Sequence, residues 1–318
     1  MRFSLVGLLA SVTLIRAGLH DGLTFEYSLD LAQASNVNWM ANIPNEALVS
    51  SLSIPGTHNT MTSVIPDLLF QCQNTDIEQQ LKAGIRYFDL TLGISDRVLY
   101  AYHAGFNTHL TLADTMGIAA RFLDQNPSEA LIVRVQKESL KFGSKKDFES
   151  AMIQFWKTPG VFGRPDKSYV YTAPGGIVSS APTLGALRGK ILIVEDFHTS
   201  TPGALGLPWK STAFSIPDTK IAIGRHWLNL KWLGMKVNLE LANKEMRNKL
   251  HITHTTVSIG AEPVTSASGD GWENKGMNDR LGKYLMDGNV ARTGIVVMDF
   301  PGKKLVNLII SRNIFRRP

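Results

Sequence analysis

Short apolar runs, rich in β-branched residues and bounded by Gly, Asp or His, recur along this chain of 318 residues. Runs of this length and composition are typical of buried β-strands. They predict strands at residues 48–54, 85–92, 98–102, 130–135, 191–194, 220–223, 251–257 and 295–298.

Apolar residues at helical spacing separate several of these runs. They predict helices at residues 76–83, 112–123, 145–156, 237–250 and 278–285, with Thr111 and Ser144 as candidate N-caps. The irregular segments 159–189 and 224–233 are expected to be loops at the rim of a pocket. Alternating strands and helices favour an α/β barrel in a single domain. The gap between residues 92 and 98 is too short for a helical crossover, so the barrel should be irregular there.

The first residues predict a targeting segment. Arg2 precedes residues 3–15, which carry no charge; this suits the core of a signal peptide but is too short to span a bilayer. We expect a signal peptide at 1–18, an N-terminal arm at 19–46 and a barrel at 47–318, and therefore a secreted protein. A buried N-terminal strand or helix is the alternative. No later segment reaches 18 consecutive apolar residues, so no transmembrane segment is expected.

Composition narrows the class of partner. The apolar fraction of 44% and charged fraction of 19% indicate an ordinary globular core rather than disorder. A net charge of +6 favours an anionic partner, either a phosphorylated substrate or an anionic membrane surface; nucleic acid is not expected, because no recognition motif accompanies the charge. The single cysteine, Cys72, excludes an internal disulfide and a zinc site with several cysteines.

Two histidines carry the candidate chemistry. His58 lies in the segment Ser-Ile-Pro-Gly-Thr-His-Asn-Thr, just beyond an apolar run, and His103 follows another. Imidazoles titrate near neutral pH, so two of them on opposite sides of a phosphate can act as base and acid in cleaving a phosphodiester. The alternative interpretation is that each is an ordinary histidine at a strand end.

Seven segments of the chain together resemble the X domain of the phosphatidylinositol-specific phospholipases C, in the compact bacterial and fungal secreted form. They begin at Ser53–His58 and continue in order with Gln71–Asn74, Gly84–Asp89, Tyr102–Ala104, Asn126–Ala130 leading to Lys137–Glu138, Arg188–Ile191 and Val297–Phe300. The resemblance extends from Trp39 to the C-terminus. It implies a distorted barrel of the triosephosphate isomerase type with its active site at the C-terminal mouth of the strands. It also implies that the inositol 2-hydroxyl attacks phosphorus, so that diacylglycerol leaves and a cyclic 1,2-phosphate forms.

The resemblance also implies roles for individual residues. His58 would be the general base, His103 the general acid, and Asp299 the carboxylate that orients His58. The expected substrate-binding residues are Asn59, Asp89, Lys137, Asp196 and Trp272. Lys137 would lie near the phosphate or the inositol, and Asp89 would be a pocket carboxylate at the end of the second strand. Salt bridges at strand ends remain the alternative for Asp89, Lys137 and Asp299.

A group of tryptophans gives a possible membrane contact. Trp227, Trp232 and Trp272, with Lys231 and Lys275 nearby, would form an aromatic and basic rim that docks on lipid headgroups. The alternative is that these side chains simply pack in the protein.

Three positions depart from the family pattern. Asn59 stands where the family usually has an aspartate coupled to the acid histidine, and Thr91 where metal-free members have an arginine that neutralises charge on phosphorus. Asp196 falls about where several relatives place an arginine against the inositol. Three explanations stay open: altered chemistry in which Arg134, Lys137 or a metal on Asp89 replaces the lost charge; a slow enzyme; or a binding protein that has lost catalysis.

The sequence therefore predicts a secreted, monomeric phosphodiesterase of the phospholipase C type, which acts on a phosphoinositide or similar phospholipid at a membrane surface. No cofactor is expected, although calcium or another divalent metal stays open. The main alternative is a catalytically weak or inactive protein that binds lipid or inositol phosphate on the same barrel. A metal-dependent phosphodiesterase such as a glycerophosphodiesterase is more remote, because that chemistry needs carboxylates around the first histidine and Asn59 is uncharged.

Overall fold

The computed structural model describes residues 26–139, 142–158, 168–216, 225–244, 247–257, 262–269, 275–288 and 290–315. The expected signal peptide, the predicted strand at 220–223 and Trp272 lie outside the described residues. Within the described part, every helix is too short or too polar to cross a bilayer.

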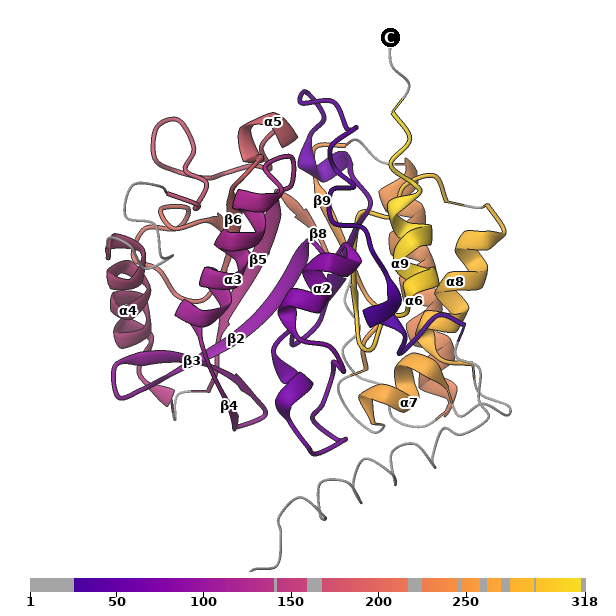
Figure 1. Cartoon of the computed structure of the whole chain (residues 1–318), viewed down its shortest axis with the longest axis horizontal. Helices are drawn as coiled ribbons and strands as arrows, with labels where there is room; N and C mark the ends of the chain where they lie inside the picture. The colour runs from indigo at the N-terminus through magenta and orange to yellow at the C-terminus, as the bar shows by residue number, and fades with distance from the viewer. Residues whose placement is uncertain are drawn as a thin grey trace, which may run out of the picture.

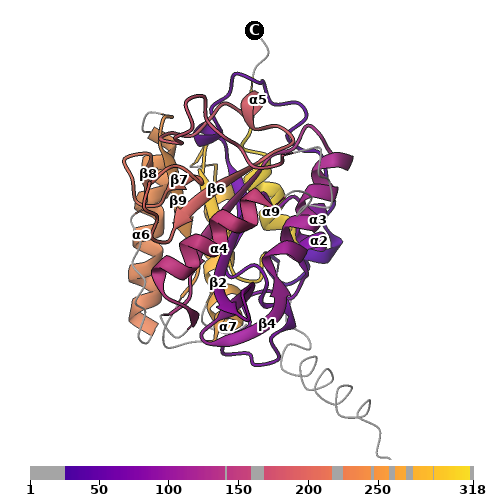
Figure 2. The same cartoon turned by 90° about the vertical axis from the view of Figure 1, so that its left-hand side faces the viewer.

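One curled parallel sheet forms the centre of the molecule (Figure 1). Its strands follow in the order β7, β6, β5, β2, β1, β10, β9 and β8, and every neighbouring pair on this path is parallel. They are β1 (Ile54–Thr57), β2 (Tyr87–Ser95), β5 (Leu131–Lys137), β6 (Ile191–Asp196), β7 (Leu207–Pro208), β8 (Phe214–Ser215), β9 (Leu250–His254) and β10 (Ile295–Met298). The two-residue strands β7 and β8 end the path, and the rings of Trp209 and Phe214 beside them lie 5.2 Å apart. The turned view shows this side of the barrel (Figure 2). The predicted distorted barrel is confirmed.

An antiparallel hairpin extends the sheet beyond β2. The strands β3 (Val98–His103) and β4 (Phe106–Thr111) follow β2 without a crossover, as the short gap predicted, although β4 itself was not predicted. Asp96 and Arg97 turn the chain with φ values of 51° and 65°, the left-handed pair that a two-residue hairpin loop needs. The hairpin carries His103 to the mouth of the barrel.

Helices cover the outer face of the sheet (Figure 1). They are α2 (Ile77–Ala83), α3 (Leu112–Gln125), α4 (Lys145–Lys157), α5 (Leu184–Leu187), α6 (Arg225–Lys244), α7 (Pro263–Ser268), α8 (Met277–Met286) and α9 (Lys303–Ile310), with 3-10 turns η1 (Leu31–Gln33), η2 (Val49–Ser51) and η3 (Thr62–Val64). Thr111 and Ser144 are the predicted N-caps, and each forms a reciprocal capping box with the aspartate three residues later.

Three sequence predictions were wrong in detail. Residues 48–54 do not form a strand: η2 occupies their middle, and β1 begins only at Ile54, where pairing with Ile295 starts. The segment 224–233, predicted as a loop, contributes to α6, which begins at Arg225. The predicted helix at 237–250 ends early, because α6 stops at Lys244 and Leu250 already pairs in β9. The helix α9 was missed, although Leu305, Val306 and Ile309 share one buried face.

Alternate residues along the strands face either the helices or the barrel interior. The interior is apolar at its base and polar at its mouth. On β5, Leu131, Val133 and Val135 pack outward beneath the helices, whereas Ile132 belongs to the inner cluster and Arg134 makes ion pairs. The inner cluster includes Tyr87, Leu192, Val194, Ile252 and Val297. Polar side chains therefore collect where the strands end.

A buried ion pair closes the opposite end of the barrel. Arg86 and Glu129 are fully buried 2.8 Å apart, and the Arg86 guanidinium also donates to the carbonyls of Asn36 and Val37. Burial is the largest influence on the pKa of Arg86 and lowers it to about 10, although Glu129 acts in the other direction. Residues 36–40 are thereby attached to the base of the barrel, since Glu129 also accepts from the amide of Met40.

Candidate active site

His58 and Asp299 meet because their strands pair in register. Thr57 and Met298 are the last paired residues of β1 and β10, so the next residue of each strand emerges at the same edge. His58 Nδ1 lies 2.9 Å from Asp299 Oδ1, and the His58 amide donates to the Met298 carbonyl. Gly56 permits this close approach of β1 to β2, since a Cβ there would lie 2.8 Å from Tyr87 Cβ. The structure thus brings together two of the three predicted catalytic residues.

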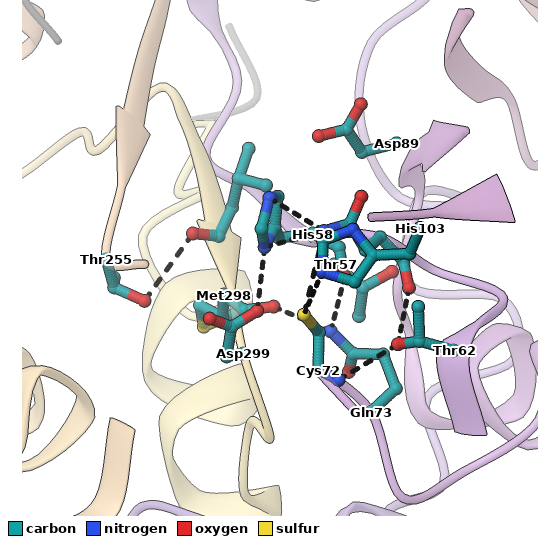
Figure 3. A network of polar contacts seen from close by, with 12 residues as sticks. Thr57, His58, Thr62, Cys72, Gln73, Asp89, His103, Thr255, Met298 and Asp299 are labelled. Atoms are coloured by element: carbon teal, nitrogen blue, oxygen red, sulfur yellow. Dashed lines mark hydrogen bonds and ion pairs between the residues drawn. The ribbon is translucent and has the colours of Figure 1, made fainter. Parts of the chain in front are cut away.

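The third predicted catalytic residue, His103, faces His58 across the mouth of the barrel (Figure 3). The imidazole centroids of His58 and His103 are 6.3 Å apart, with their planes at 78°. The amide of Asn59 lies between them: Nδ2 is 3.1 Å from His58 Nε2 and 3.5 Å from His103 Nε2. Asn59 has a φ of 41°, a left-handed conformation that Asn adopts more easily than most residues.

The two histidines have opposite electrostatic surroundings. Burial opposes protonation of His58, but the Asp299 carboxylate and the nearby Cys72 outweigh it and raise the His58 pKa well above its ordinary value. Burial and the neighbouring His58 lower the pKa of His103 to about 4. Burial also raises the pKa of Asp299, while His58, Cys72 and Lys231 act against that rise. Asn59 carries no charge with which to support protonation of His103.

Sequence reasoning missed three side chains that surround this pair. The Cys72 thiol is buried, with Sγ 3.6 Å from Asn59 Nδ2 and 3.9 Å from His103 Nε2. Gln73 Nε2 donates to the carbonyls of His58 and Met298 and so ties the two strand ends together. The ring of His254, at the end of β9, lies 6.5 Å from that of His58. The match at residues 71–74 and the strand-end position of His254 were the available signals.

Asp89 and Asp196 form one ion-pair cluster with Arg134. Arg134 Nη1 lies 3.1 and 3.2 Å from the two carboxylate oxygens of Asp89, and Nε lies 3.2 Å from Asp196. The guanidinium also lies 4.1 Å from the ring centroid of Trp209. Burial opposes its charge, but the two aspartates raise the pKa of Arg134 further above its ordinary value. Asp89 lies within β2 rather than at its end, and its position on Arg134 leaves it poorly suited to bind a metal.

The position of the missing arginine is occupied by a neutral hydrogen bond. Thr91 Oγ1 accepts from Gln136 Nε2 at 2.6 Å. Lys137 Nζ donates to the backbone carbonyls of Glu138 and Ser139, and partial burial lowers its pKa. Arg134 and Lys137, the two cations considered as replacements, therefore both have partners within the protein.

The predicted tryptophan rim is only partly described. Trp232 packs edge-on against Tyr284, with ring centroids 5.6 Å apart, which is the packing alternative. Lys231 is buried rather than at a rim, and its charge lowers the pKa of Asp299. The side chain of Trp227 and all of Trp272 lie outside the described residues.

Comparison with known proteins supports the barrel fold and the family resemblance. The family described as phosphatidylinositol-specific phospholipase C, X domain, matches residues 49–196, a span that includes His58 and His103. Over these residues the chain is similar to this family. The 1-phosphatidylinositol phosphodiesterase of Listeria monocytogenes is 29% identical over 290 residues, which cover 87% of this chain and 85% of that protein.

Other similarities extend beyond the matched domain. A 1-phosphatidylinositol phosphodiesterase of Staphylococcus aureus is 24% identical over 87% of this chain and 92% of its own length. The solved structure of the phosphatidylinositol-specific phospholipase C from Listeria monocytogenes aligns with a TM-score of 0.73 at 25% identity, covering 89% of this chain and 100% of that one. The X-domain resemblance inferred from seven short segments is confirmed over residues 49–196, and the similarity to the Listeria monocytogenes enzyme extends over most of the chain.

Proposed function

We propose that this protein is a phosphodiesterase of the phospholipase C type that cleaves the glycerol–phosphate bond of phosphatidylinositol or a similar phospholipid. The proposal depends on one observation: the imidazoles of His58 and His103 face each other across the mouth, and Asp299 is hydrogen-bonded to Nδ1 of His58. The similarity to phosphodiesterases over most of the chain supports the same reaction class.

The geometry supports a division of labour between the imidazoles. When neutral His58 donates its Nδ1 proton in a hydrogen bond to Asp299, its Nε2 lone pair faces the mouth of the barrel. This lone pair accepts the proton of the attacking hydroxyl. The imidazolium that forms is stabilised by the buried Asp299 carboxylate. His103 then donates a proton to the leaving glycerol oxygen. As the family resemblance implies, the attacking group is the inositol 2-hydroxyl and the first product is a cyclic 1,2-phosphate.

The protonation states make this chemistry slower than the arrangement allows. Catalysis needs neutral His58 and protonated His103, yet the pKa of His58 is raised and that of His103 is lowered to about 4. Between these values the free protein holds mainly the opposite pair of states. The productive form is then a small, nearly constant fraction. A bound phosphodiester anion would raise the pKa of His103 and recover part of the loss.

The test is headgroup release from phosphatidylinositol vesicles by the parent chain and by His58→Ala. We expect the substitution to lower turnover by roughly 10²- to 10⁴-fold, the usual worth of general base catalysis. His109→Ala, which removes an exposed histidine of β4, is the matched control and should retain parental turnover. Equal turnover in His58→Ala and the parent would refute the proposal.

A second candidate function is binding of the same lipid or headgroup without turnover. It is favoured by the neutral Thr91–Gln136 pair and by the commitment of Arg134 to Asp89 and Asp196, since neither feature leaves a cation for the phosphorane charge. This alternative predicts vesicle binding with no released headgroup in the same assay, with or without added calcium. A clear time course of release excludes it.

Apolar side chains at the mouth support a membrane-surface substrate. Val64, Leu69 and Phe106 are 52%, 59% and 43% exposed, and a group of exposed apolar side chains is typical of a surface that contacts a membrane or a partner. The ring of Phe70 packs against that of Phe106, with centroids 4.8 Å apart, and edge-on against the ring of His103. The mouth rim, formed by Val64, Leu69 and Phe106, therefore lies close to the proposed acid. We propose that the mouth rim inserts among lipid headgroups. Secretion, suggested by residues 1–18, and a monomeric state belong to the same proposal.

A further inference from the structure

We propose that the catalytic pocket also binds a thiophilic divalent cation, with Zn²⁺ as the type case, through His58, Cys72 and Asp299, and that this cation inhibits the enzyme. The binding half of the proposal stands on geometry alone. The inhibition half rests on the proposed function.

The donor atoms already converge. One ligand atom each of His58, Cys72 and Asp299 lies within 4.8 Å of the others. Zinc bonds of about 2.0–2.3 Å place the donors of a tetrahedral site about 3.3–3.8 Å apart, so side-chain movements of about 1 Å would close the cluster. His103 Nε2, 3.9 Å from Cys72 Sγ, is positioned as a fourth donor. Figure 3 shows the sulfur of Cys72 directed toward the two histidines.

A second observation points to a ligand at this place. Asp299 is only 2% exposed, and in the described part of the chain its Oδ2 receives no hydrogen bond from an N–H or O–H group, although the weakly donating Cys72 thiol lies beside the carboxylate. An oxygen left unsatisfied in this way destabilises the folded protein, and coordination of a cation would satisfy it.

The chemistry of the donors selects the cation. A thiolate, an imidazole and a carboxylate suit Zn²⁺ or Co²⁺, whereas Ca²⁺ and Mg²⁺ prefer sets of oxygen ligands. The charges also balance, because the two charges of the cation match the carboxylate of Asp299 and the thiolate of Cys72. Burial and Asp299 raise the pKa of the Cys72 thiol, so in the absence of metal it keeps its proton at neutral pH.

Binding would disable the general base by moving a proton. The cation takes His58 Nδ1, the nitrogen that faces Asp299, and the proton held there moves to Nε2. Nε2 then has no lone pair for the substrate hydroxyl. The thiol proton of Cys72 leaves to solvent, and a second proton leaves when His58 begins as imidazolium.

The first test measures binding without turnover. The parent chain, freed of metal with a chelator and dialysed, is titrated with Co²⁺ while the absorption spectrum is recorded. We expect a thiolate-to-cobalt charge-transfer band and the strong visible bands of a four-coordinate ion. In Cys72→Ser and Cys72→Ala the charge-transfer band should disappear and the affinity should fall by at least 10- to 100-fold, since changes outside the ligand shell already cost that much.

Controls separate the cluster from adventitious binding. His198→Ala removes an exposed histidine outside the cluster and should leave the cobalt spectrum and affinity unchanged. Circular dichroism and melting in chelator show whether each Cys72 variant is folded; two replacements of different size guard against a folding defect in one. A spectrum without a thiolate band, or unchanged cobalt affinity in a folded Cys72 variant, overturns the proposal.

The second test measures headgroup release with Zn²⁺. We expect zinc to inhibit the parent reversibly, with full recovery in chelator, and to inhibit Cys72→Ser only at concentrations at least tenfold higher, each variant being compared with its own metal-free rate. Equal zinc sensitivity in both would overturn the inhibitory role. If the parent releases no headgroup at all, the proposed activity fails while the cobalt titration still decides whether the cation site exists.

Discussion

Between the two imidazoles, the Asn59 amide lies within hydrogen-bond distance of His58 Nε2, the atom that accepts the substrate proton in the proposed mechanism. A carboxylate at this position would instead attract positive charge onto His103 and onto His58. The substitution of one oxygen by an amino group thus affects both partners. It removes support for the acid and places a competing donor at the base.

Asn59→Asp should therefore change the pH dependence of kcat/KM, which reports the free protein. In the parent, activity should rise as the pH passes the His103 pKa of about 4 and should fall only when the pH exceeds the raised pKa of His58. Between these two pH values activity should stay level, because the small population of the productive form is constant there. With a new negative charge beside it, His103 should titrate at higher pH. The acidic limb then moves up, and the plateau rises by about tenfold for each unit by which the increase in the His103 pKa exceeds that in the His58 pKa.

The check is a pH series of headgroup release by both proteins, from pH 3 to pH 10 or about that range. Asn59→Ser is the matched control, since it shortens the side chain without adding charge. An acidic limb at the same pH in Asn59→Asp and the parent would contradict the assignment of His103 as the acid.

At the scale of elements, the loop that carries η3 and residues 65–70 lies beside the β3–β4 turn, because Phe70 contacts both Phe106 and His103. Together they place Val64, Leu69 and Phe106 in solvent at the mouth. Transfer of exposed apolar side chains from water into a lipid interface lowers the free energy of the system.

Leu69→Asp should weaken binding to phosphatidylinositol vesicles by roughly tenfold or more, because a leucine side chain contributes about 1.5–3 kcal/mol when it is fully buried and a carboxylate is repelled by anionic lipid. Vesicle sedimentation measures the effect. Turnover of a soluble phosphodiester substrate should be unaffected, since the exposed Leu69 side chain has no role in the proposed proton transfers. Val237→Asp, on the exposed face of α6, is the control, and an equal loss there would argue against the mouth rim.

The elements also show where sequence patterns fail. Apolar periodicity located α2, α3 and α4 because each has an N-cap and one buried face. Residues 48–54 are equally apolar but form η2, since their burial comes from contacts distant in the chain, including the hydrogen bond from Val49 to the Pro182 carbonyl.

For the whole molecule, parallel register is what converts a sequence motif into a site. The segment around His58 and the segment around Asp299 are distant in sequence, and only the pairing of β1 with β10 brings them together. The family resemblance supplied that pairing. It did not reveal that Arg134 holds Asp89 and Asp196 together, because ion pairs across β2, β5 and β6 depend on which residues of each strand face inward. Nor did it assign a role to Cys72, although the matched segment 71–74 contains this residue.

The central claim is that His58 and His103 cleave a phosphodiester by attack of a neighbouring hydroxyl, and the identity of the first product tests it most directly. Phosphatidylinositol vesicles are incubated with the parent chain in chelator and followed by phosphorus NMR, with His58→Ala alongside. The account predicts that a five-membered cyclic phosphodiester of inositol appears first with the parent, and that His58→Ala forms it at least 100-fold more slowly, within the range expected for loss of a general base. An acyclic phosphomonoester as the first product, or no phosphorus product at all from the parent, would contradict it.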